Sequence, residues 1–212
     1  MKGINRERQE ELANTLTHGI GILFGIIAMP ILISLAAVHG SGVKVIGTIV
    51  YGFSFLLVFT ASTLYHLSEN PETKRKFRIL DHISIYFMIA GSYTPFIIAF
   101  LNNYEGMLFL VIQWSLVLFG ILFKLFYTHR FQYLSLLIYV TMGWLILFAP
   151  AEFYAAIPTS CIVLMIVGGV LYTVGVLFFI WHKLKFSHAI WHVFVLAASI
   201  CHYVAILLTV SA

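Results

Sequence analysis

The sequence predicts an all-α integral membrane protein with seven transmembrane helices, a cytoplasmic N-terminus and an external C-terminus. Three observations predict this fold: an apolar composition, seven apolar runs of helical length, and Lys and Arg on alternate loops. Of the 212 residues, 61% are hydrophobic and 9% are charged, and the mean hydropathy is +1.00. Soluble domains carry about 25% charged residues, so the apolar excess must face lipid.

Each apolar run is long enough for one crossing, which takes roughly 20 apolar residues. The runs span 18–38, 44–67, 79–100, 106–127, 131–150, 159–181 and 187–210. Backbone polar groups in lipid must be satisfied within the segment, so each run is expected to be a helix. We predict a single domain over 1–212, with 1–17 as a short cytoplasmic segment. Pro95 and Pro150 are expected to kink or end helices near the outer face.

Basic residues predict the orientation of these helices. Lys44 stands alone on one side, whereas eleven basic residues fall on the other: Lys2, Arg6, Arg8, Lys74, Arg75, Lys76, Arg78, Lys124, Arg130, Lys183 and Lys185. By the positive-inside rule the basic side is cytoplasmic. A missed or extra helix would have distributed the basic residues over both sides. The membrane therefore accounts for the net charge of +4, and no nucleic-acid partner is predicted. Acidic residues before the first run argue against a cleaved signal peptide.

Nine histidines in so apolar a chain are informative, because ionisable residues in spanning helices are costly and usually functional. His188 and His192 are four residues apart, so they share one face at the cytoplasmic start of the last helix. His66 ends the second helix on the same side, and Asp81 begins the third helix there. The topology, deduced from Lys and Arg alone, thus brings these four side chains to one depth.

Three histidines with an open fourth position are typical of a catalytic zinc site. Zinc lowers the pKa of a bound water towards neutrality. Asp81 could orient that water or act as general base. Ser62, one turn before His66 on the same face, could donate to a substrate or a ligand. Spacing alone leaves open that His188 and His192 are interfacial residues, since the HExxH signature of zinc proteases is absent.

The remaining histidines and two glycines have plainer interpretations. His202 lies about 21 Å beyond His188 along the helix axis, so it is expected to be a buried hydrogen-bonding residue. His18 opens the first helix, either beside the site or at the interface. Gly21 and Gly25 allow close helix packing, within the chain or in a homo-oligomer. Solvated positions are expected for His39, His129 and His182.

Four ordered motifs cover nearly the whole chain and resemble those of the progestin and adipoQ receptor family, in particular its bacterial hemolysin III branch. The motifs are Glu11-x-x-Asn14-x-x-x-His18, Ser62-x-x-x-His66, Leu80-Asp81 through Ala90-Gly91-Ser92-Tyr93-Thr94-Pro95, and Ser187-His188-x-x-x-His192 followed by His202.

The resemblance implies a seven-helix protein of the bacterial plasma membrane that binds Zn²⁺. By motif, the resemblance implies that His66, His188 and His192 are the zinc ligands. It implies that Asp81 contacts a water at the zinc, and that Glu11, Asn14 and His18 lie around the ligands. The wider superfamily includes alkaline ceramidases, which implies hydrolysis of a membrane lipid amide. The name hemolysin comes from a pore-forming activity attributed to one bacterial member.

Two classes of function stay open at this point. The first is a zinc-dependent hydrolase that acts on a membrane lipid amide. The second is a non-enzymatic regulator of the membrane, or a pore-forming hemolysin, with a structural zinc site. Few charges lie midway along the runs to line an aqueous pore. A retinal-binding rhodopsin is excluded because 187–210 contains no Lys, and a rhomboid protease because Gly91-Ser92-Tyr93 is not its GxSG motif.

Overall fold

The computed structural model describes residues 2–39, 41–127 and 130–211, with side chains described from Arg6 onward, and His129 lies outside these ranges. The described residues form helices and no strand. In chain order the elements are α1 (Lys2–His39), α2 (Gly42–Leu67), α3 (Pro71–Phe100), α4 (Tyr104–Tyr127), α5 (Gln132–Trp144), the 3₁₀ helix η1 (Leu145–Phe148), α6 (Ala151–Ala156), α7 (Thr159–Ile180) and α8 (Ser187–Ser211).

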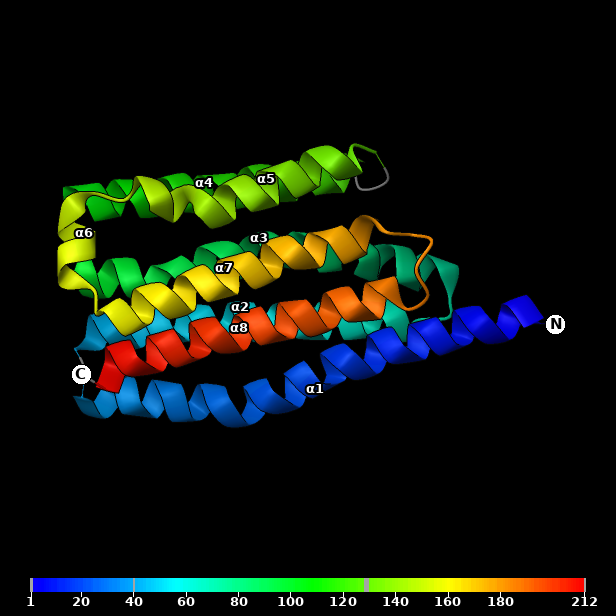
Figure 1. The fold of residues 1–212 in the computed structure, drawn as a ribbon, viewed down its shortest axis with the longest axis horizontal. Helices are drawn as coiled ribbons and strands as arrows, with labels where there is room; N and C mark the ends of the chain where they lie inside the picture. Colours follow the sequence, from blue (N-terminus) through cyan, green and yellow to red (C-terminus); the bar gives the residue numbers. More distant parts are fainter. Residues whose placement is uncertain (1, 40, 128–129, 212) are drawn as a thin grey trace.

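Six helices in the described ranges are long and apolar enough to cross a membrane, namely α1, α2, α3, α4, α7 and α8. Their axes run along the length of one bundle, and the start of α1 and the end of α8 lie at opposite ends of it (Figure 1). Many large apolar side chains point outward, among them Leu23, Ile27 and Phe126. Such an apolar exterior is what a lipid solvent requires.

The fifth apolar run differs from the expected single helix over 131–150. The α-helix α5 has 13 residues and passes into the four-residue η1. Ala149 is extended, with φ −63° and ψ 146°, because the ring of Pro150 disfavours the helical conformation in the residue before it. The expected loop 151–158 then contains the six-residue α6.

The first helix also begins earlier than predicted. Residues 2–17 of the expected segment are helical, because α1 runs for 38 residues from Lys2. Its first turns are polar, and hydropathy detects the apolar part of a helix but not a polar extension. The helix therefore continues beyond the apolar run on the side where the histidines lie.

The third helix begins at Pro71, eight residues before the apolar run. The Asn70 side chain accepts hydrogen bonds from the backbone N–H groups of Glu72 at 3.0 Å and Thr73 at 3.1 Å. This N-cap and a proline at the first helical position are a strong start signal. Pro95 lies inside α3 and does not end it.

Close packing of α1 on α2 explains the two glycines. A Cβ atom at Gly21 would lie 2.2 Å from the ring of Phe59, and one at Gly25 would lie 2.7 Å from Leu56. Both glycines thus serve packing within the chain. The core beside them includes the buried Phe55 and Leu32.

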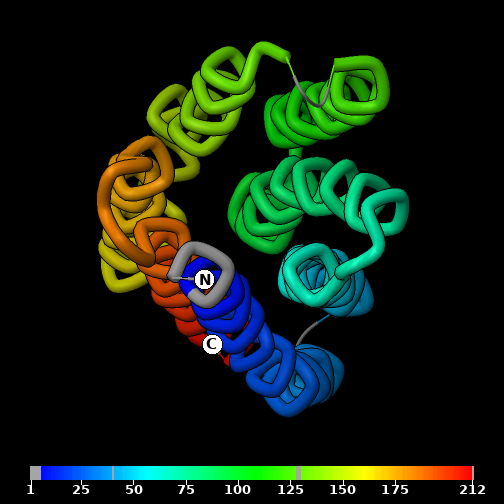
Figure 2. Tube along the Cα trace, turned by 90° about the vertical axis from the view of Figure 1, so that its right-hand side faces the viewer, coloured from blue at the N-terminus to red at the C-terminus, as the bar shows by residue number. Residues whose placement is uncertain are grey.

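The helices surround a cavity of about 350 Å³, here called the central cavity. Seen end-on, α4 and α5 lie across the bundle from α1 (Figure 2). The cavity is lined from α1, α2, α3, α4, α5, η1, α7 and α8, by residues that include Ser62, Asp81, Trp144, Met165 and His192. The fold therefore places Ser62, Asp81, His188 and His192 along this cavity, whereas Glu11, Asn14 and His66 line a second hollow.

Candidate metal centre

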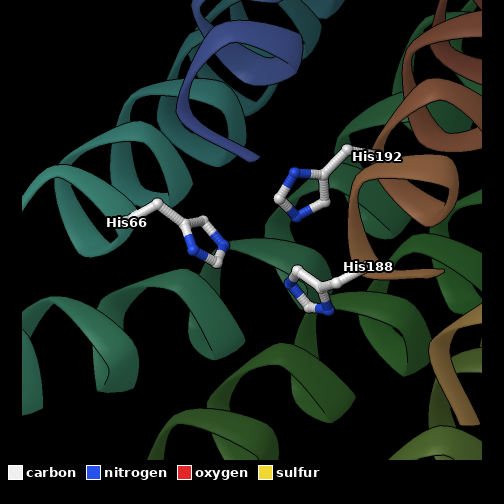
Figure 3. A group of neighbouring side chains, drawn as sticks. All are labelled: His66, His188 and His192. Carbon is white, nitrogen blue, oxygen red and sulfur yellow. The ribbon is translucent and has the colours of Figure 1, made fainter. Parts of the chain in front are cut away.

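Three histidines from two helices converge beside the central cavity. The last turn of α2 carries His66, and the first two turns of α8 carry His188 and His192. One candidate ligand nitrogen from each lies within 4.8 Å of the others, and the three rings point towards one another (Figure 3). His66 and His192 are buried, and His188 is half-buried. The three histidines that the predicted topology placed at one membrane depth therefore also lie close to one another.

Hydrogen bonds from α1 orient two of these rings. The Nδ1 atom of His66 lies 2.6 Å from Oε2 of Glu11, and Nδ1 of His192 lies 3.3 Å from the backbone oxygen of Asn14. Both acceptors suit an N–H on Nδ1, which leaves the lone pair of each ring on Nε2. The Nε2 atom of His66 is buried without a hydrogen-bond partner among the described residues. Metal-binding histidines are oriented in this way by partners of the other ring nitrogen.

One face of α1 supplies the groups around the histidines. Glu11, Asn14 and His18 are spaced by three and four residues, so they share that face. The other oxygen of Glu11, Oε1, lies 2.6 Å from Nζ of Lys74 on α3. Lys74 was not predicted at the site, and neither was Thr17, whose hydroxyl lies 3.3 Å from Nδ1 of His192.

His18 lies at the site and not at the lipid interface. Its ring centroid is 3.7 Å from that of His192 and 4.9 Å from that of Phe59. The side chain is buried, and neither ring nitrogen has a hydrogen-bond partner among the described residues. It stands outside the group of three whose nitrogens could share a metal.

Asp81 and Ser62 face the same cavity. The Asp81 carboxylate lies next to the Ser62 hydroxyl and close to the His66 ring. Ser62 is 1% exposed, and no hydrogen bond of good geometry joins its Oγ to a described residue. A carboxylate and a hydroxyl thus stand beside the three imidazoles, where both can reach a bound molecule.

His202 lies deeper in the cavity, as its spacing predicts. Its Nε2 atom is 3.4 Å from the backbone oxygen of Met165 on α7. A Cβ atom on Gly168 would lie 2.5 Å from its ring, so the absence of a side chain at Gly168 makes room for the imidazole. The position fits a buried hydrogen-bonding residue between α7 and α8.

Comparison with known proteins places the chain in a family. A family profile described as "Haemolysin-III related" matches residues 6–203. The chain belongs to the haemolysin-III related family. The match includes every residue of the candidate centre, from Glu11 to His202.

Similar proteins occur in bacteria and in animals. The chain is 44% identical to the "Hemolysin-3 homolog" of Bacillus subtilis over 94% of its own length and 93% of that protein. It is 44% identical to "Hemolysin-3" of Bacillus cereus over 94% and 91%. It is 31% identical to the human "Monocyte to macrophage differentiation factor" over 93% and 83%. With its six apolar helices, the chain is a multi-pass membrane protein, consistent with the bacterial plasma membrane.

Proposed function

We propose that the chain holds one zinc ion at His66, His188 and His192 and hydrolyses an amide bond of a membrane lipid. The observation that carries the proposal is the convergence of these three rings beside a largely apolar cavity that Asp81, His188 and His192 line. An acyl chain requires such a cavity, and a hydrolytic reaction requires polar groups at one place along it.

The donor set fits zinc. Imidazole nitrogens bind zinc at about 2.0–2.1 Å, and catalytic sites commonly use three protein ligands with one position left open. A bound ion would draw together nitrogens that lie within 4.8 Å of one another. It would also give the buried Nε2 of His66 a partner, and a polar atom buried without one is costly. When bound, zinc polarises a carbonyl group and activates water for attack.

Side chains around the metal centre and the cavity transfer the proton, orient the histidines and bind the lipid. Asp81 accepts a proton from the attacking water and returns it to the leaving amine. Ser62 donates a hydrogen bond to the polar part of the lipid. Glu11 and the backbone of Asn14 keep the His66 and His192 rings in orientation. Apolar side chains of the central cavity, such as Met165, hold the acyl chain.

We further propose a single domain that crosses the membrane seven times, with the N-terminus and the metal centre at the cytoplasmic side. Six crossings would leave both termini on one side, yet they lie at opposite ends of the bundle (Figure 1). The segment Gln132–Phe148 supports the seventh crossing, because a helix of its length spans about 27 Å, close to a hydrocarbon core of about 30 Å.

A second candidate function is a membrane regulator with a structural zinc ion. The observation that favours it is that the candidate ligands come from two helices, α2 and α8. A metal there would fasten these helices together, as structural zinc sites do. The two functions differ in whether the protein turns over a lipid.

Incubation of purified protein with ceramide and other N-acyl lipid amides tests the proposal. We expect release of fatty acid that a zinc chelator abolishes. Asp81→Asn should keep its zinc and lower turnover by at least about 100-fold, since a general base contributes on the order of 10²–10⁴. Glu152→Gln, at an exposed position of α6, is the control and should retain activity. Zinc bound without turnover of any amide would favour the regulator.

A further inference from the structure

The second hollow, which Glu11, Asn14 and His66 help to line, lies at the polar end of α1. Its walls come from the first turns of α1, the end of α2, the loop after it and the start of α3, and its volume is about 720 Å³. His66 lines this hollow, whereas His188 and His192 line the central cavity. Because the three candidate ligands also lie close together, the metal centre stands where the two spaces approach each other.

Half of the acidic residues in the sequence line the second hollow. The sequence has eight, and four of them line it: Glu7, Glu10, Glu11 and Glu69. Glu10 and Glu11 form ion pairs with basic side chains. Glu7 and Glu69 are exposed at its mouth and form no ion pair with a described residue. The basic residues in its described lining are Arg8 and Lys74. A cleft in which one sign of charge predominates concentrates ions of the opposite sign, so the hollow attracts cations.

Two buried atoms without hydrogen-bond partners lie at the inner end of the second hollow. Asn14 is 6% exposed and His66 is 7% exposed, and both line the hollow. The Oδ1 atom of Asn14 and the Nε2 atom of His66 have no partner among the described residues. The two side chains are adjacent, with Nδ2 of Asn14 3.4 Å from Nδ1 of His66. Amide oxygens and imidazole nitrogens are both metal ligands, so a cation that reaches this end meets an oxygen beside the first histidine.

An ion can reach His66 through the second hollow without losing its water. One water takes about 30 Å³ of liquid volume, so a hollow of about 720 Å³ holds many waters. The wall of the central cavity is largely apolar, with Val58, Ile85 and Val176 among its residues. Transfer of an ion from water into such surroundings is strongly unfavourable. The second hollow is therefore the favourable path for a metal ion.

We propose that the second hollow is the route by which a divalent cation enters and leaves the metal centre. Glu7 and Glu69 attract the ion at the mouth, and the Oδ1 atom of Asn14 binds it briefly before His66 does. This route rests on the proposed metal centre and explains how that centre is loaded. A route changes the rates of uptake and release but not the equilibrium affinity, because the affinity depends on the two end states alone. That property separates a route from a further ligand.

Reversible covering of the hollow tests the route in the purified full-length protein. Leu12 lines the hollow and is 57% exposed, so Leu12→Cys can carry a bulky, polar and uncharged group attached with a methanethiosulfonate reagent. Zinc uptake by the chelator-stripped protein and zinc release to excess chelator should both slow by the same factor. The zinc bound at equilibrium should stay at the parent value. Reduction of the mixed disulfide should restore both rates.

A second cysteine variant provides the matched control. Thr73 is exposed at the start of α3 and does not line the hollow, so modified Thr73→Cys should keep the parent rates. Parent protein treated with the same reagent accounts for any reaction at Cys161 and Cys201.

Removal of the charges at the mouth gives a second measurement. Glu7→Gln with Glu69→Gln should slow zinc uptake about tenfold at low ionic strength, the lower end of the 10–10³ that such focusing contributes. The difference from the parent should shrink as salt is added, because salt screens exposed charges. Glu72→Gln, which alters an exposed carboxylate outside the hollow, should leave the rate unchanged.

Three results would overturn the route. One is parent rates of uptake and release in modified Leu12→Cys. Another is less zinc bound at equilibrium after the modification, which would make the hollow part of the ligand site. The third is parent uptake at low ionic strength in the variant that lacks Glu7 and Glu69. A parent protein that binds no zinc would instead refute the metal centre itself, and its zinc content shows this before any rate is measured.

Discussion

Two polar regions inside the bundle differ in how completely their groups are paired. The histidine centre holds buried atoms with no hydrogen-bond partner among the described residues, including both ring nitrogens of His18 and Nε2 of His66. Two turns further along α8 lies a tyrosine network of Tyr51, Tyr172 and Ser199. There the hydroxyl of Tyr51 donates to the Ser199 backbone oxygen at 2.8 Å, and that of Tyr172 lies 2.7 Å from Ser199 Oγ.

The difference shows which region finds all its hydrogen-bond partners within the chain and which region leaves polar groups for a bound species. A polar group left unpaired in a membrane interior costs several kcal/mol, so an evolved protein retains such groups where something else pairs them. The tyrosine network pairs its hydroxyl groups within the chain, which is expected of a structural element. The histidine centre leaves donors and acceptors for a bound species, which is expected of a functional one.

Removal of two candidate ligands should have the largest effect on the histidine centre. We expect His188→Ala with His192→Ala to lower zinc from about one ion per chain to almost none, because a single imidazole cannot hold the ion. Elemental analysis of the purified protein measures this. His202→Ala, which alters the deeper histidine, should keep the parent zinc content. Equal zinc in the double variant and the parent would contradict the assignment of the centre.

A smaller effect should follow from removing the carboxylate that orients His66. Glu11→Gln should weaken zinc binding by about 10–100-fold, the usual cost of losing a partner of a metal-binding histidine. Competition with a chromophoric chelator measures the affinity. Glu10→Gln is the matched control, because Glu10 pairs with Arg6 at the exposed side of α1. The same affinity in both variants would mean that Glu11 does not orient the ligand.

The fold was largely predictable because hydropathy reports the apolar length of each helix. It could not reveal the polar turns at the start of α1, which begins at Lys2. The start of α3 did have a sequence signal, Asn70 followed by Pro71, that hydropathy ignores. The break near Ala149 also had one in Pro150, which was expected to kink or end a helix there, but no residue type signals the earlier change from α5 to η1 at Leu145.

The candidate centre was predictable only where spacing or topology carried information. Four-residue spacing places His188 and His192 on one face, and the charge pattern brings His66 to their depth. The contact of His192 with the backbone oxygen of Asn14 leaves no trace in the sequence, because every residue has that oxygen.

The smallest expected effect lies in the tyrosine network. Tyr172→Phe removes one hydroxyl, but Ser199 keeps its bond to the Val195 backbone oxygen at 2.8 Å. Hydrogen bonds within membrane proteins contribute about 0.5–1 kcal/mol, so the melting temperature should fall by about 2 °C with zinc content unchanged. Tyr133→Phe, at a site 72% exposed, should alter neither. A loss of zinc in Tyr172→Phe would instead show that the network holds α8 in the position that the histidines need, and the two regions would then be one functional unit.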